Sequence, residues 1–233
     1  MIPQEGSNLP RPKFSAVLFD CDGVLVDSES ITNAVLREML IELGWDISQE
    51  ECISIFIGKA LKDQWEPILA HTGVRIDEQW ITGFRQRRDV ALRENLQAVP
   101  GALEAVKQIS AAYCEKIACA TGADRAKVEM QLSITRMAPF FGNRVYSGME
   151  YAQSKPAPDV YLAAASGLHI DPSQAAVVED TVTGVTAGVA AGATVFGYCP
   201  GGPISSTEEK LLAAGAAEVF TNMDQLPGLL TQK

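Results

Sequence analysis

Hydrophobic residues in this chain of 233 residues gather in short runs, and three of these runs stop abruptly at acidic or hydroxyl side chains. Short apolar runs of this kind are typical of strands buried on both faces of a parallel sheet. The runs, with the residue that follows each, are 14–19 before Asp20, 117–120 before Thr121 and 175–178 before Glu179. Ligands of open α/β sheets bind beyond the carboxyl ends of the strands. We therefore expect these polar side chains to meet at one edge and to form a site there.

From residue 99 onward, segments with helical periodicity alternate with short apolar segments. Helices are expected at 101–112, 125–132, 158–165, 182–191 and 208–214. The remaining strands are expected at 144–146, 194–198 and 218–220. Strands and helices that alternate with short connections predict an α/β fold with a doubly wound, Rossmann-like parallel sheet.

The connection between the first two strands is far longer than a parallel crossover requires. Its pattern is helical almost throughout, with helices expected at 28–44, 49–56, 60–71 and 78–96. All three tryptophans fall in this region, and we expect them mainly in the core of a helical bundle. We therefore expect an all-helical domain at 28–97, inserted into a core domain formed by 1–27 and 98–233. The two hinges are expected near residues 26–27 and 98–100.

Charge and cysteine content exclude several classes of protein. The formal net charge is −10, which argues against nucleic-acid or anionic-membrane binding, because both need a basic surface. The five cysteines are widely spaced and include no C-x-x-C pair, so we expect reduced thiols in a cytoplasmic protein. Residues 1–13 contain three prolines and no apolar segment typical of a signal peptide, so we expect a loose arm.

Asp20 and Asp22 stand just beyond the first expected strand, in an arrangement suited to phosphoryl transfer. A carboxylate fixed at a strand end can attack phosphorus, which makes Asp20 the candidate nucleophile. Asp22 is placed to donate a proton to the leaving oxygen and then to accept one from water. Gly23 lets the chain turn at once, which brings backbone N–H groups close to phosphoryl oxygens. Each acid alone is equally typical of a turn, and the match at three strand ends favours catalysis.

Carboxylates from two strand ends are expected to share one small space. Their mutual repulsion would be relieved by a hard divalent cation, and Mg²⁺ favours carboxylate and phosphate oxygens. We therefore expect Asp20 and Asp180 to bind Mg²⁺. Glu179 is expected either as a third ligand or as an acid that orients the ligands without contacting the metal.

The expected phosphate site also contains a hydroxyl, an accessible backbone and an ammonium group. Thr121 and Gly122 end the second strand and offer the first two of these groups. Lys155 lies in a loop that contains two prolines. Its ammonium would offset negative charge on Asp20 and on the transferred phosphoryl group.

Four segments, in order along the chain, resemble the four motifs of the haloacid dehalogenase-like superfamily. They are Phe19-Asp20-Cys21-Asp22-Gly23-Val24, Thr121, Ser154-Lys155-Pro156, and Val178-Glu179-Asp180-Thr181 with Gly184. The helical insertion is similar to the cap domain of the subgroup that includes β-phosphoglucomutase and phosphatases of small metabolites. The resemblance implies that Asp20 is the nucleophile and that Asp22 is the acid and base, which also binds metal through its backbone carbonyl. It further implies phosphate contacts from Thr121 and Lys155, and Mg²⁺ contacts from Glu179 and Asp180.

The resemblance favours a Mg²⁺-dependent phosphatase that works through an aspartyl-phosphate, and it leaves alternatives open. A dehalogenase would not need Asp22, and a phosphonate-cleaving enzyme would need a cap lysine that nothing in the sequence singles out. A phosphosugar mutase would carry a histidine where this chain has Thr32. A non-catalytic sensor of phosphorylated metabolites would be expected to lose Asp20 or Asp22. Thr121 itself departs from the subgroup, which often has Ser followed by Asn at this position.

Specificity is expected to come from the cap, which would close over a small phosphorylated metabolite and exclude water. The cap cations that could hold the remote part of a substrate are Lys59, Lys62, Arg85 and Arg88, although any one of them could instead belong to a solvated helix face. Segments 25–29, 58–59 and 196–199 are similar to those of 6-phosphogluconate phosphatases, which implies sugar-like substrates. We expect a monomer or a weak homodimer.

Overall fold

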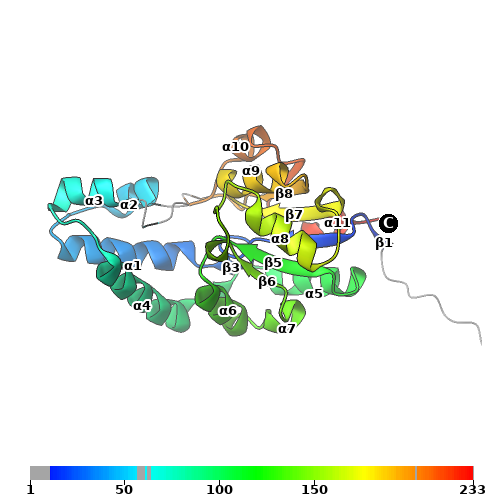
Figure 1. Ribbon diagram of the computed structural model, residues 1–233, viewed down its shortest axis with the longest axis horizontal. Helices are drawn as coiled ribbons and strands as arrows, with labels where there is room; N and C mark the ends of the chain where they lie inside the picture. The colour runs from blue at the N-terminus through cyan, green and yellow to red at the C-terminus, as the bar shows by residue number, and fades with distance from the viewer. Residues whose placement is uncertain (1–10, 57–60, 62–63, 203, 233) are drawn as a thin grey trace, which may run out of the picture.

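The computed structural model describes residues 11–56, 61, 64–202 and 204–232. Within these residues, the central feature is a parallel sheet of six strands in the order β6-β5-β2-β7-β8-β9 (Figure 1). The strands are β2 (Ala16–Phe19), β5 (Ile117–Thr121), β6 (Val145–Ser147), β7 (Ala175–Glu179), β8 (Thr194–Tyr198) and β9 (Glu218–Phe220). The predicted doubly wound α/β fold is confirmed.

Strand β2 lies at the centre of the sheet, between β5 and β7. The chain winds outward from it on both sides, so the gap beside β2 is a switch point of the topology, where open α/β sheets bind ligands. The register places Phe19 opposite Cys119 on one neighbour and opposite Val178 on the other. The three strands therefore end at nearly the same level.

Helices cover both faces of the sheet, because β2 sends alternate side chains in opposite directions. Val17 and Phe19 belong to one buried cluster, and Ala16 and Leu18 to the other. The first cluster is completed by α5 (Ala102–Ala112), α6 (Arg125–Ile134), α7 (Ala138–Phe141) and α11 (Leu226–Leu230). The second is completed by α8 (Asp159–Gly167), α9 (Val182–Ala190) and α10 (Glu208–Ala213). Single 3₁₀ turns lie at Gly148–Glu150, Pro172–Gln174 and Met223–Gln225.

A helical lobe stands apart from the sheet, at the left of Figure 1. It consists of α1 (Glu29–Glu42), α2 (Gln49–Phe56), α3 (Trp65–Thr72) and α4 (Glu78–Asn95). These helices share a hydrophobic cluster of their own that includes Trp45 and Ile47. The lobe is joined to the sheet through β3 (Val26–Asp27) and β4 (Gln97–Ala98), which pair antiparallel at the two positions where hinges are expected.

The observed elements differ from the expected ones mainly at their ends. The third helix of the lobe begins at Trp65, whereas the sequence pattern places its start near residue 60, which lies outside the described residues. The expectation of a loose arm over residues 1–13 is wrong for its last part, and residues 1–10 are not described. Strand β1 (Arg11–Pro12) pairs antiparallel with β10 (Thr231–Gln232), and the Lys13 N–H donates to the Leu230 carbonyl over 3.0 Å. Within the described residues, no helix is long and apolar enough to cross a membrane.

Candidate active site

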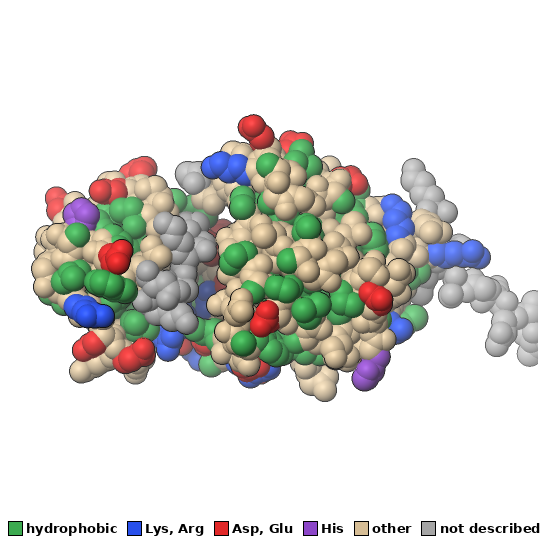
Figure 2. All heavy atoms as spheres, turned by 45° about the horizontal axis from the view of Figure 1, so that its top comes forward, with side chains coloured by type: hydrophobic (Ala, Val, Ile, Leu, Met, Phe, Trp, Pro, Cys, Tyr) green, Lys and Arg blue, Asp and Glu red, His purple; other side chains and the backbone are tan. Residues whose placement is uncertain are grey.

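A cleft of about 580 Å³ lies where the ends of the central strands face the helical lobe. In Figure 2 the outline of the molecule is indented between the helical lobe, at the left, and the larger part that contains the sheet. Asp20, Thr121 and Glu179 line the cleft from the ends of β2, β5 and β7. Helices α1 and α4 line it from the other side. The strand-end residues therefore do share one space.

Asp20 is buried at the floor of this cleft and is held by Lys155. The Lys155 Nζ lies 2.5 Å from Asp20 Oδ1, and Lys155 also donates to the Ala120 carbonyl over 3.1 Å. Burial raises the pKa of Asp20 to about 7, because the loss of hydration outweighs the attraction of the Lys155 ammonium. Burial alone would lower the pKa of Lys155, but the charges of Asp20 and Glu179 raise it well above its ordinary value. Lys155 is therefore a permanent cation beside the candidate nucleophile.

Gly23 and Asp180 fit so closely against each other that a side chain at position 23 would displace the Asp180 carboxylate. Gly23 has a φ of +81°, and a Cβ atom there would overlap the Asp180 carboxylate. Asp180 Oδ1 is buried and, among the described residues, accepts no hydrogen bond. Burial and the charges of Glu179 and Asp20 raise the pKa of Asp180 well above its ordinary value. A buried carboxylate oxygen without a donor is a group that a cation could bind.

Glu179 is buried, and donors surround its carboxylate. Its Oε1 accepts from Lys155 Nζ and from the Tyr161 hydroxyl, both over 2.7 Å. Its Oε2 accepts from the Asp180 N–H and from both the N–H and the hydroxyl of Thr181, over 3.1 to 3.3 Å. The backbone of Gly184 lies so close that a Cβ atom there would overlap this carboxylate. The orientation of Glu179 is therefore fixed from several sides.

The three carboxylates fit a small divalent cation. Asp20, Glu179 and Asp180 each place one oxygen within 4.8 Å of the others. All the donor atoms are oxygens, and two of the carboxylates keep an oxygen that can bind a cation. Such a set suits a hard ion such as Mg²⁺. Asp180 has the free oxygen, whereas Glu179 is largely occupied by its donors. The side chain of Asp22 lies outside this group of oxygens.

The carboxylate of Asp22 instead accepts four hydrogen bonds, from Lys127 and Gln131 on α6 and from Ser28. Lys127 Nζ lies 2.9 and 2.8 Å from its two oxygens, and Gln131 Nε2 lies 2.8 Å from Oδ1. The Ser28 hydroxyl also donates to Oδ1. Burial alone would raise the pKa of Asp22, but Lys127 and the hydrogen bonds lower it below its ordinary value.

Three partners of Asp22 and Glu179, namely Lys127, Gln131 and Tyr161, are residues that the sequence pattern did not single out. Lys127 and Gln131 are one helical turn apart, directly after the strand that ends in Thr121. The sequence carried no signal for them, because this helix also contains Arg125, Glu129 and Ser133. Tyr161 carried no signal either, because a tyrosine in an apolar helix is ordinarily part of the core.

The other predicted phosphate contacts lie beside Asp20. Thr121 is buried, and its Oγ1 accepts from the Ala123 N–H over 3.1 Å, so that its own hydroxyl hydrogen is free to donate. Gly122 lines the cleft, and nothing lies within 4 Å of the place where a Cβ would stand. This leaves open space beside the Gly122 backbone for a ligand.

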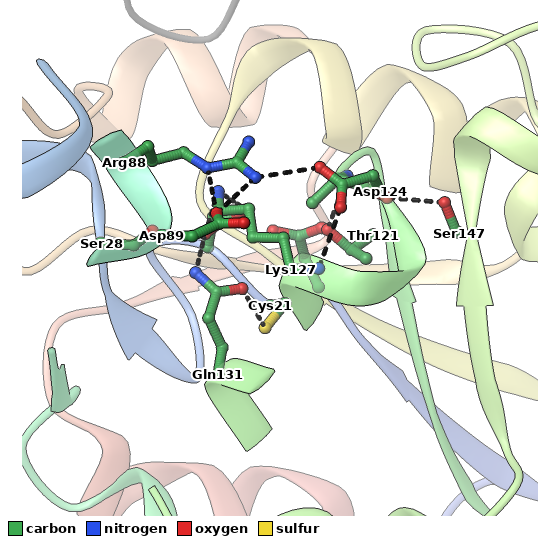
Figure 3. A network of polar contacts seen from close by, with 12 residues as sticks. Cys21, Ser28, Arg88, Asp89, Thr121, Asp124, Lys127, Gln131 and Ser147 are labelled. Atoms are coloured by element: carbon green, nitrogen blue, oxygen red, sulfur yellow. Dashed lines mark hydrogen bonds and ion pairs between the residues drawn. The ribbon is translucent and has the colours of Figure 1, made fainter. Parts of the chain in front are cut away.

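The predicted cap cations separate into three kinds. Lys59 and Lys62 lie outside the described residues. Arg88 is buried on α4 and forms ion pairs with Asp89 at 2.7 Å and with Asp124 at 3.2 Å (Figure 3). It therefore does not belong to a solvated helix face. Arg85 lines the same cleft and forms no ion pair with any residue of the described chain. Arg85 is therefore the cap cation that is free to meet a ligand.

Comparison with known proteins identifies the family. A family model described as haloacid dehalogenase-like hydrolase matches residues 14–192. The chain belongs to this family. The 6-phosphogluconate phosphatase of Escherichia coli (strain K12) is 27% identical over 218 residues, which cover 93% of this chain and 95% of that protein. The resemblance inferred from the sequence motifs is therefore confirmed, and the chain is a hydrolase by family.

Solved structures of this family share the fold over nearly the whole chain. A conserved haloacid dehalogenase-like protein of unknown function from Agrobacterium tumefaciens str. C58 has a TM-score of 0.79 and 27% identity, covering 93% of this chain and 97% of that one. A family hydrolase from Deinococcus radiodurans R1, with bound phosphate and sodium, has a TM-score of 0.76 and 30% identity, covering 94% of this chain and 99% of that one.

Proposed function

We propose that this hydrolase is a Mg²⁺-dependent phosphatase that cleaves a small, sugar-like phosphate monoester through an aspartyl-phosphate. The observation that carries the proposal is the convergence of Asp20 and Lys155 in one cleft, with a carboxylate oxygen of Asp180 within 4.8 Å of one of Asp20. These groups supply a nucleophile, a fixed positive charge and a cation ligand. The phosphatase named among the relatives supports the same class of reaction.

In the first step, Asp20 attacks phosphorus. Its Oδ1 is bound to Lys155, so Oδ2 is the oxygen that attacks. Asp22 takes up the proton that the monoanionic ester carries when it binds, and passes it to the bridging oxygen of the ester as the bond between phosphorus and that oxygen breaks. The Thr121 hydroxyl and the Lys155 ammonium face the phosphoryl oxygens and stabilise the charge that develops on them.

In the second step, water attacks the phosphorus of the aspartyl-phosphate and gives a proton to Asp22. The ion pair with Lys127 keeps Asp22 ionised, which is the form that accepts this proton. The carboxylate of Asp20 leaves, and inorganic phosphate is released. Through its whole cycle, Lys155 remains fixed by Glu179 and by the Ala120 carbonyl.

Asp20, Asp180 and Glu179 are the residues that would hold Mg²⁺, and the backbone carbonyl of Asp22 is proposed as a further ligand. A bound Mg²⁺ would neutralise the carboxylates and polarise the phosphoryl oxygens. Glu179 would contribute mainly by orienting its neighbours, because its oxygens already accept hydrogen bonds from Lys155, Tyr161 and Thr181.

The helical lobe would select the substrate, and a phosphorylated sugar or sugar acid fits what lines the cleft. Arg85 has no ion-pair partner in the described chain and would meet a remote carboxylate or hydroxyl. Thr32 and Asn33 on α1 also line the cleft, and Thr32 Oγ1 and Asn33 Oδ1 are buried without a partner among the described residues. Hydroxyl-rich ligands satisfy such groups, whereas purely apolar esters would leave them unpaired.

The test is phosphate release from a panel of sugar phosphates, sugar-acid phosphates and simple alkyl phosphates, with Mg²⁺ or with a chelator. We expect Mg²⁺-dependent release that favours the sugar-like esters, and no release from the Asp20→Asn variant. Activity near that of the wild type in Asp20→Asn would remove Asp20 as the nucleophile. Interconversion of hexose phosphates without release would indicate a mutase, and tight binding without turnover would indicate a sensor.

A further inference from the structure

The hydrogen bonds to Asp22 are distributed unevenly over its two oxygens. Among the described residues, Oδ1 accepts from Lys127, from Gln131 and from Ser28, whereas Oδ2 accepts from Lys127 alone, over 2.8 Å. A carboxylate oxygen has two lone pairs, so three donors saturate Oδ1. Oδ2 keeps the capacity to bind one more hydrogen. The two oxygens of Asp22 are therefore not equivalent.

The donors of Asp22 belong to a rigid part of the fold. Asp124 caps the start of α6 by accepting from the Lys127 N–H over 2.9 Å, and it is held in turn by Arg88. Gln131 lies one helical turn beyond Lys127 and is completely buried. Its amide donates to Asp22, and its Oε1 accepts from Cys21 Sγ over 3.6 Å (Figure 3).

A buried glutamine is costly unless its polar atoms are paired, and a leucine would fill the same core position more simply. The amide of Gln131 is paired at both ends with the loop that follows the nucleophile, since Cys21 and Asp22 directly follow Asp20. The pairing fixes the rotation of the Asp22 carboxyl group. A group that exchanges protons with two partners in turn needs such a fixed orientation.

We propose that Lys127 and Gln131 are positioning residues that hold the Asp22 carboxyl group so that Oδ2 is the oxygen that exchanges protons. The inference rests on the proposed phosphatase function and deepens it. In the first step the O–H bond at Oδ2 breaks and its proton passes to the bridging ester oxygen, which leaves with the electron pair of the broken P–O bond. In the second step a proton of the attacking water returns to Oδ2.

The test compares two esters whose leaving groups differ in their need for a proton. An alkyl phosphate expels a basic alkoxide and depends on proton donation, whereas p-nitrophenyl phosphate expels a weakly basic phenolate and depends on it little. The variants are Gln131→Met and Lys127→Met, which remove the donors with little change of side-chain length. The measurement is the rate of leaving-group release in a single turnover, which reports the first step alone.

We expect each variant to slow release from the alkyl ester by about 10-fold or more, within the 10²–10⁴ range of general acid catalysis. Release from the aryl ester should change much less, and Asp22→Asn should show the same selectivity more strongly. Lys127→Arg should restore part of the alkyl rate, because it keeps a donor. Glu129→Gln, an exposed position on the same helix, is the matched control and should leave both rates unchanged.

Equal slowing of leaving-group release from both esters would overturn the proposal, because a loss of packing alone would affect the two esters alike. Unchanged rates would overturn it as well. If Gln131→Met does not fold, Gln131→Glu keeps the shape of the side chain and removes the donor. A wild-type protein that hydrolyses no ester of the sugar-phosphate panel would refute the proposed function itself, which is a different result from hydrolysis without selective loss in the variants.

Discussion

At the scale of single residues, Gly23 connects the backbone turn after the nucleophile with the candidate cation site. Its φ of +81° is a conformation that other residues adopt only at a cost of about 1–2 kcal/mol. Its missing side chain also leaves the space that the Asp180 carboxylate fills. One glycine thus meets two separate requirements, one of the backbone and one of the neighbouring strand end.

Gly23→Ala should therefore impair activity more than it impairs folding. The added methyl group has to push Asp180 aside, so we expect a loss of kcat of at least about 10-fold, as for a displaced group at a reacting centre. Gly192→Ala is the matched control, since Gly192 also has a positive φ of +88° but nothing within 4 Å of a Cβ. Steady-state kinetics and urea unfolding of both variants test this expectation. Equal losses of activity in the two would show that backbone strain alone is responsible.

The place of a residue at the cleft could be predicted from the sequence where it ends a strand. Asp20, Thr121 and Glu179 follow apolar runs, and parallel strands necessarily bring such residues to one edge. Lys127 and Gln131 were missed because a helix face becomes a site only through its packing angle against the loop, and no local pattern contains that angle. The absence of a donor to Asp180 Oδ1 among the described residues could not be predicted either, because it depends on how the chain packs around that oxygen.

At the scale of elements, α4 and α6 form a direct connection between the helical lobe and the sheet. Arg88 on α4 reaches Asp124, the residue that caps α6, and it pairs with Asp89 on its own helix as well. The strands and most helices of the chain were predictable because their apolar periods are regular. This contact was not, because Arg88 has the sequence surroundings of an exposed helix face, among Arg85, Arg87 and Asp89.

Arg88→Met should destabilise the protein by about 1–3 kcal/mol, because it removes hydrogen bonds between charged, largely buried groups and leaves the carboxylate of Asp124 without its partner. Arg87→Met is a suitable control on the same helix, since the ion pair of Arg87 with Glu42 is exposed and should contribute little. Chemical denaturation of both variants gives the comparison. If the two lose equally little stability, the buried pair does not connect the lobe to the sheet energetically.

At the scale of the whole molecule, the fold separates the reacting groups from the groups that would recognise the rest of the substrate. The sheet supplies Asp20, Lys155 and Asp180, and the helical lobe supplies Arg85 and Asn33 across the cleft. The chain passes between these two parts twice, through the paired strands β3 and β4. We propose that the lobe, at residues 28–97, is a separate domain that can change its position relative to the core without disturbing the strand ends. Substrate choice and chemistry can then vary independently, because they depend on different elements.

We expect the carboxylates at the strand ends to make the stability of the whole molecule depend on a divalent cation. Asp20, Glu179 and Asp180 are brought within 4.8 Å of one another only in the folded chain, so Mg²⁺ should bind the native state far better than the unfolded state. At a concentration of about 100 times Kd, this linkage contributes about 2.7 kcal/mol. For a chain of this size, that corresponds to a rise in Tm of about 5–10 °C.

Thermal unfolding with Mg²⁺ and with a chelator measures the rise without any substrate. Asp180→Asn should lose most of it, because its amide cannot replace the charge of the carboxylate whose Oδ1 is unpartnered. Gln108→Asn, on the exposed side of α5, should keep it. An equal rise in wild type and Asp180→Asn would place the cation elsewhere in the molecule.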